Sequence, residues 1–136
     1  MGQNEKIKMK SEKLQLKEKN DIKARAFNFS LSIIDLLKSL PRDYIYQTLG
    51  KQLLRASTSI GANIIEAQAG SSKRDFTNYL YISLKSANET KYWLAILREK
   101  SESSLKQDIS KLLQECQELG NILGASILTI KGRRNF

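Results

Sequence analysis

This sequence of 136 residues contains no histidine, one cysteine and one proline. Histidine is the side chain that titrates near neutral pH and the commonest metal ligand, so histidine-based catalysis is excluded. A single cysteine cannot form an intramolecular disulfide, and there is no cluster of cysteines and histidines with the spacing of a zinc site. A disulfide-stabilised domain is therefore excluded, and a reducing compartment such as the cytoplasm fits the composition best.

Long apolar runs are missing as well. No uninterrupted apolar stretch approaches the ~20 residues that a membrane-spanning helix needs. The N-terminus is basic but lacks the apolar segment of a secretory signal. No phosphate-binding glycine loop, dinucleotide fingerprint or metal motif is present. We therefore expect a cytoplasmic protein without a membrane partner, a cofactor or a metal.

Positive charge is abundant instead. The 23 Lys and Arg residues outnumber the 14 Asp and Glu residues, which gives a formal net charge of +9. Such a balance favours polyanionic partners without identifying one. Lysines crowd residues 1–20, where few apolar side chains are present, so we predict a basic mobile arm or helix extension there. Residues 21–131 form one predicted domain, and residues 132–136 a basic tail.

Apolar residues recur at helical spacing through the rest of the chain. They predict four helices, at about residues 21–40, 41–69, 72–100 and 104–132. Pro41 separates the first two, Gly70 is the expected C-cap of the second, and Gly132 is expected to end the fourth. Ser72 and Asp75 resemble a capping box at the start of the third. Short connections between long amphipathic helices predict an all-α, antiparallel up-down-up-down four-helix bundle.

The third predicted helix has more apolar surface than one bundle interior requires. Its apolar arc spans roughly 200°, twice the common stripe. The second stripe consists of Tyr79, Ile82, Ser86, Trp93 and Ile96. Four glycines also lie within predicted helices, each at a cost of about 1 kcal/mol relative to alanine. These are Gly50, Gly61, Gly120 and Gly124. Packing within the bundle and packing between subunits are both open explanations for the stripe and the glycines.

Two short segments carry a family resemblance. They are Ser59-Ile60-Gly61-Ala62-Asn63-Ile64-Ile65-Glu66 and Ser86-Ala87-Asn88-Glu89. Through them, and over about residues 21–131, the chain resembles the bacterial four-helix-bundle family whose genes often sit in intervening sequences of large-subunit ribosomal RNA genes. The accessory variability determinant proteins of diversity-generating retroelements are similar to that family. The resemblance implies a ring-like homo-oligomer, and specifically a homopentamer.

The polar residues of these segments are candidates for contacts rather than for catalysis. Asn63, Glu66 and Glu89 are expected to make inter-helix or inter-subunit contacts, with ligand or RNA contacts as the alternative. Gly61, Trp93, Gly120 and Gly124 complete the candidate packing or oligomer contacts. Because no nucleophile, metal ligand set or water-excluding pocket accompanies the two glutamates, we predict no catalytic residue and no enzyme. Cys116 lies on an apolar seam and is expected to be buried.

The bundle topology predicts where positive charge collects. The start of the first helix, the turn between the second and third, and the end of the fourth share one end. The cations of the turn and the C-terminus are Lys73, Arg74, Lys131, Arg133 and Arg134. On one face of the third helix, Tyr81, Lys85 and Tyr92 are further candidates for contact with unstacked bases. Tyrosines are also common in protein interfaces, and charge also serves solubility.

The leading hypothesis is a non-enzymatic homo-oligomeric bundle that binds nucleic acid or ribonucleoprotein through this basic end. One alternative is a protein-interaction adaptor, with a reverse transcriptase as the extreme case of a partner. Another is a purely structural oligomer whose charge serves solubility. No recognition helix-turn-helix, zinc finger or aromatic RNA-binding signature separates these hypotheses.

Overall fold

The computed structural model describes residues 2, 4 and 21–134. Most of the arm predicted for residues 1–20 lies outside the described residues. Within the described part the ordered elements are four helices without a strand, which confirms the all-α prediction. They are α2 (Ile22–Ser39), α3 (Tyr44–Gln68), α4 (Lys73–Lys100) and α5 (Ser103–Arg134).

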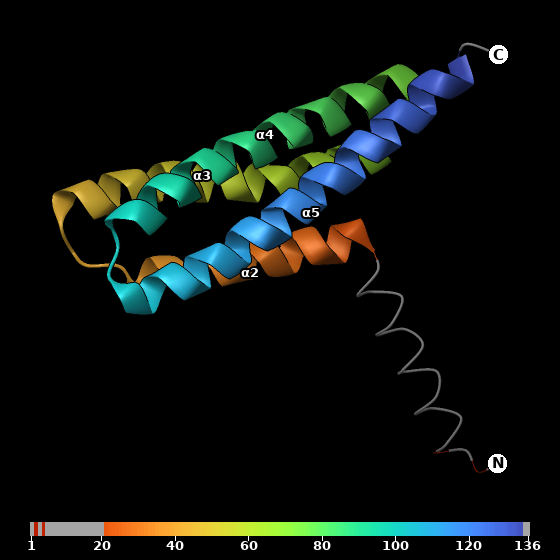
Figure 1. Cartoon of the computed structure of the whole chain (residues 1–136). Helices are drawn as coiled ribbons and strands as arrows, with labels where there is room; N and C mark the ends of the chain where they lie inside the picture. The colour runs from red at the N-terminus through yellow and green to blue at the C-terminus, as the bar shows by residue number, and fades with distance from the viewer. Residues whose placement is uncertain (1, 3, 5–20, 135–136) are drawn as a thin grey trace.

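The helices form an antiparallel up-down-up-down bundle. Each packs on its neighbours in the chain, and α2 also packs on α5, which closes the arrangement. The start of α2, the end of α3, the start of α4 and the end of α5 lie toward one end (Figure 1). With 18 residues against 32, α2 is much shorter than α5, so at this end α5 extends beyond the start of α2 (Figure 1).

Side-chain caps define the starts of three helices. The Asp21 carboxylate accepts from the Lys23 N–H at 2.9 Å, and the Asp43 carboxylate accepts from the Ile45 N–H at 2.7 Å. Ser72 Oγ accepts from the Asp75 N–H at 3.1 Å, as the predicted capping box requires. Each cap satisfies a backbone N–H that has no partner within its helix. The short connections between the helices follow from these defined ends.

Two glycines do not end helices as predicted. The C-cap of α3 is Ala69, with right-handed dihedrals of φ −88° and ψ −4°, and none of the described glycines has a positive φ. Gly132 was predicted to end the last helix, but α5 continues through it and ends at Arg134. Both predictions were wrong because glycine permits a left-handed helix end without imposing one.

The core runs the length of the bundle and takes side chains from all four helices. Its largest fully buried apolar side chains are Ile33, Leu53, Ile60, Ile64, Leu94, Leu97, Ile109, Leu119 and Leu123. Cys116 is buried among them, as predicted. Its thiol donates to the Ala87 carbonyl oxygen at 3.3 Å, so α5 also bonds to α4 inside the core.

Close helix packing explains two of the helix glycines. A Cβ added to Gly50 would lie 3.1 Å from Leu37 Cδ2, and one added to Gly61 would lie 3.4 Å from Ala26 Cβ. Both glycines therefore let α2 approach α3 closely. Gly120 is buried, whereas a Cβ on Gly124 would meet nothing within 4 Å. Packing within the described subunit therefore does not explain Gly124.

Candidate nucleic-acid interface

Exposed cations collect at the end of the bundle where α4 begins and α5 ends (Figure 1). Lys73 and Arg74 lie in the first turn of α4, and Lys131 lies near the end of α5. Among the described residues, no carboxylate lies within 4 Å of any of these three. Because a helix N-terminus carries partial positive charge, the start of α4 adds to the potential of Lys73 and Arg74. Arg133 and Arg134 are the last residues of α5.

One of these cations is held by an aromatic ring. Lys131 Nζ lies 4.8 Å from the centroid of the half-buried Tyr81 ring, which makes a cation–π contact between α5 and α4. Such contacts at exposed sites contribute about 0.5–1 kcal/mol. Tyr81 therefore positions a cation at the basic end, and that ring face is already occupied.

The remaining aromatic candidate faces solvent. Tyr92 is 61% exposed and meets Trp93 edge to face, with ring centroids 5.3 Å apart. Lys85 is exposed two turns earlier on the same side of α4. Of the two tyrosines predicted as nucleic-acid contacts, Tyr92 is the one whose ring is open to a base.

Glu89 joins α3 to α4 away from the basic end. Its carboxylate accepts from Trp93 Nε1 at 2.8 Å and forms an ion pair with Arg55 of α3. The hydrogen bond from Trp93, followed by the one from Arg55, lowers the pKa of Glu89 from its ordinary value of 4.5. The side chain is therefore an ionised link between two helices at neutral pH.

This link predicts a small dependence of stability on pH. Because the folded state lowers the Glu89 pKa, its contribution is present above pH 4.5 and is lost as the pH falls through the lowered value. Glu89→Gln should cost under about 1 kcal/mol near neutral pH, since the pair is partly exposed. The cost should shrink when urea unfolding is repeated at an acid pH well below 4.5. Glu99→Gln in the same helix is the control, and an equal cost at both pH values for Glu89→Gln contradicts the prediction.

A second polar chain connects the motif residues. Asn63 Nδ2 donates to the Ser59 carbonyl oxygen at 2.8 Å and to Ser59 Oγ at 2.9 Å. Ser86 Oγ of α4 donates to the same Ser59 Oγ at 2.9 Å. Glu66 is exposed, and no described cation lies within 4 Å of its carboxylate.

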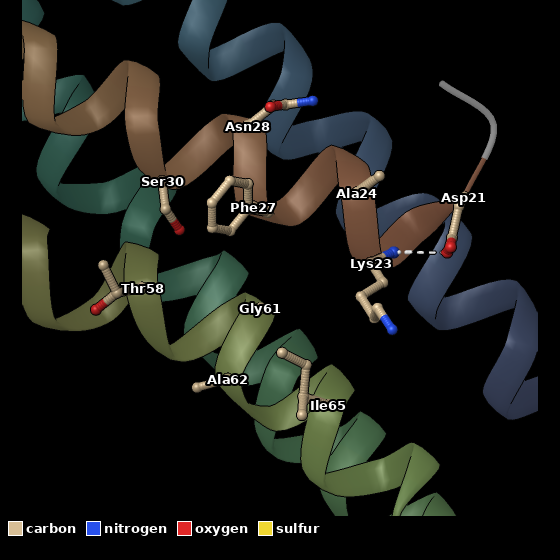
Figure 2. Close-up of a pocket in the computed structure, with 10 residues that line it drawn as sticks. All are labelled: Asp21, Lys23, Ala24, Phe27, Asn28, Ser30, Thr58, Gly61, Ala62 and Ile65. Atoms are coloured by element: carbon tan, nitrogen blue, oxygen red, sulfur yellow. Dashed lines mark hydrogen bonds between the residues drawn. The ribbon is translucent and has the colours of Figure 1, made fainter. Parts of the chain in front are cut away.

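The structure also contains an apolar groove that the sequence analysis did not identify. It lies between α2 and α3, has a volume of about 840 Å³ and is shown in Figure 2. Phe27 lies on the α2 side of the groove, and Thr58, Gly61, Ala62 and Ile65 line its α3 side (Figure 2). Among the described residues of the lining, the charged ones are Asp21 and Lys23. The groove is therefore suited to an apolar surface.

The described residues offer neither a metal-binding cluster nor a membrane-spanning helix. Residues 21–134 hold no group of three or more acidic or cysteine side chains placed to bind a metal ion. None of the four helices is long and apolar enough to cross a membrane.

Comparison with known proteins identifies the family. Residues 18–125 match the family model of the 23S rRNA-intervening sequence protein. The chain belongs to this family. A similar solved structure is a protein of unknown function from the S23 ribosomal protein family of Bacteroides thetaiotaomicron, with 36% sequence identity and a TM-score of 0.72. The similarity covers 79% of this chain and 98% of that one. No curated protein matches the chain.

In this chain, the two motif segments lie on neighbouring turns of α3 and α4 and contact each other. Ser86 of the second segment donates to Ser59 of the first, which also accepts from Asn63, and Glu89 of the second pairs with Arg55 of α3. These contacts hold neighbouring helices together. The cations of the basic end belong to other parts of the chain.

Proposed function

We propose that this cytoplasmic protein is a non-enzymatic homo-oligomer, a pentamer by its family resemblance, that binds nucleic acid or ribonucleoprotein through its basic end. The observation that carries the proposal is the exposure of Lys73, Arg74 and Lys131 at one end, without a described carboxylate within 4 Å. Arg133 and Arg134 follow on the same helix end. The exposed cations Lys73, Arg74 and Lys131, grouped in this way, attract a phosphate backbone.

Self-association would strengthen binding to a polyanion because each subunit contributes one basic end. In a ring whose bundles stand parallel to its axis, every subunit presents the same end on one rim. A long polyanion then contacts several basic ends at once, so its apparent affinity rises without any new contact within a subunit. Phosphate contacts of this kind position a nucleic acid without reading its sequence. Binding with weak sequence preference is expected.

A titration across salt concentrations tests the nucleic-acid part. Fluorescent RNA and DNA oligonucleotides are titrated with the protein, and the logarithm of the affinity is plotted against the logarithm of the salt concentration. For the variant with glutamine at Lys73, Arg74, Arg133 and Arg134, the slope should become less steep by roughly 3, because each phosphate contact contributes about 0.7–0.9. Affinity near physiological salt should fall at least roughly tenfold.

The chain offers a matched control at the opposite end of the bundle. Replacing Lys38, Arg42, Arg98 and Lys100 with glutamine removes the same number of charges. This control should keep most of the binding if the basic end is the contact surface. Equal losses of affinity in both variants would mean that net charge, and not the basic end, determines binding. Absence of saturable binding by the wild type at low salt would contradict nucleic-acid binding.

Light scattering on the wild-type protein tests the homo-oligomer separately. The expected mass is several times the monomer mass, with five subunits as the specific expectation. A monomer at all accessible concentrations would contradict the oligomer and with it the repeated rim.

The adaptor hypothesis makes a different prediction, namely that affinity purification recovers a specific protein such as a reverse transcriptase together with nucleic acid.

A further inference from the structure

The α2–α3 groove leaves large apolar side chains in solvent. Phe27 and Ile65 line it and are 63% and 54% exposed. Leu31, one turn after Phe27, is 45% exposed, and Leu54 on the same side of α3 is 38% exposed. A soluble monomer seldom leaves such a set together on one side. The α3 side of the groove is lined by Gly61 and by the small side chains of Thr58 and Ala62, so the edge of another helix can approach closely.

A second exposed surface of the same chain, between α3 and α4, has groups complementary to those of the groove. Ile82 on α4 is 44% exposed. Because Ser86 bonds to Ser59, the antiparallel register places Ile82, one turn earlier, beside the turn of α3 that holds Asn63 and Glu66. Glu66 is exposed and unpaired among the described residues. This edge, defined by Ile82 and Glu66, thus combines an apolar side chain with a free carboxylate.

The groove lining holds one cation, Lys23, and one carboxylate, Asp21, which caps the start of α2. Lys23 is exposed, and no described carboxylate lies within 4 Å of its ammonium group. The edge therefore offers Ile82 and Glu66 where the groove offers Phe27 and Lys23. An apolar contact flanked by opposite charges is the usual anatomy of a specific protein interface.

The two surfaces also lie at the same height in the bundle. Ala26 packs on Gly61, so Lys23, one turn nearer the start of α2, lies level with the turn of α3 that holds Ile65 and Glu66. A closed ring has no rise along its axis. When parallel bundles form such a ring, contacting residues of neighbouring copies must share a height, as the groove and the edge do.

We propose that the α2–α3 groove receives the edge defined by Ile82 and Glu66 of a second copy of this chain, with Lys23 facing Glu66 of that copy. The contact joins two different faces and is heterologous, which is the type that generates rings. The inference rests on the self-association proposed above and specifies its surface. One copy uses its groove and its edge toward two different neighbours.

The first test fills the groove. Ala62 is exposed, so Ala62→Arg leaves the core of the subunit intact while placing a long charged side chain in the contact. Ala125→Arg adds the same charge at an exposed position of α5 and is the control. Light scattering should show a monomer for the first variant and the wild-type mass for the second, with equal helix content by circular dichroism. A wild-type mass for Ala62→Arg overturns the proposal.

The second test exchanges the charges. Lys23→Glu and Glu66→Lys should each weaken assembly about tenfold or more, because each places like charges across the contact. The double variant restores opposite charges and should recover the wild-type mass at the same protein concentration. Single variants that assemble normally, or a double variant no better than the singles, overturn the pairing. A monomeric wild type would instead refute the self-association proposed under the function, so the two failures are distinguishable.

Discussion

Replacing Leu94 with alanine is expected to lower the free energy of unfolding by about 2–5 kcal/mol. Leu94 is fully buried in α4 and belongs to the core that all four helices share. Truncation removes buried apolar atoms and leaves a cavity that rigid helices only partly close. Since domains of this size are stable by only about 5–15 kcal/mol, the loss is a large fraction of the total.

Urea unfolding followed by circular dichroism measures the effect of Leu94→Ala. The matched control is Leu128→Ala, because Leu128 is 71% exposed on α5 and has little buried area to lose. Both variants are compared with the wild type at one protein concentration, since self-association would make stability concentration-dependent. Similar costs for the two leucines would mean that Leu94 is not in the core described above.

Replacing Ser83 with leucine should destabilise the protein by about 1–3 kcal/mol or more. Ser83 is fully buried, and its hydroxyl donates to the Ile60 carbonyl oxygen of α3 at 2.8 Å. Ser57, which is also fully buried, keeps the facing helix small in this region. A leucine has no space there, so α3 and α4 must separate or adopt strained rotamers.

Two further variants separate overpacking from the loss of the hydrogen bond. Ser83→Ala removes only the bond and should cost about 0.5–1.5 kcal/mol. Ser110→Leu adds the same bulk at an exposed position of α5 and should change stability by less than about 0.5 kcal/mol. Thermal and urea unfolding give the ranking, and a Ser83→Leu variant as stable as Ser83→Ala would contradict the close packing of the two helices.

The regular part of the fold was predictable because local signals agree with the topology. Pro41 separates two amphipathic segments, and Ser72 caps the helix that its spacing to Asp75 predicts. Cys116 falls on an apolar seam and is buried. Short connections then allow only neighbouring antiparallel helices. The ends at Gly70 and Gly132 failed because a glycine alone does not determine whether backbone dihedrals become left-handed.

The candidate surfaces were predictable only where topology alone decides them. An up-down-up-down order brings Lys73 and Lys131 to one end whatever the packing details. The cation–π contact of Lys131 with Tyr81 depends on side-chain conformations that periodicity does not contain. The second stripe of α4 is divided in the structure, because Trp93 is half-buried and packs against the core whereas Ile82 is 44% exposed.

The groove was missed for a related reason. Phe27 lies beside the apolar seam of α2, and a single aromatic residue next to a seam is compatible with core packing. Its exposure of 63% follows from how α2 rests on α3, at a distance that the contact between Gly61 and Ala26 sets. A signal was nevertheless present, since Phe27 and Leu31 are spaced by one helical turn and form a short apolar stripe of their own.

The burial of Cys116 makes this chain a convenient starting point for site-specific labelling. Its side chain is inaccessible, and burial raises the pKa of the thiol to about 12, so almost no thiolate is available to maleimides or iodoacetamides at neutral pH. A cysteine introduced at an exposed position, such as Ala125, would react alone while the native residue stays in place. Fluorophores or spin labels can thus report distances between subunits in an otherwise unaltered core.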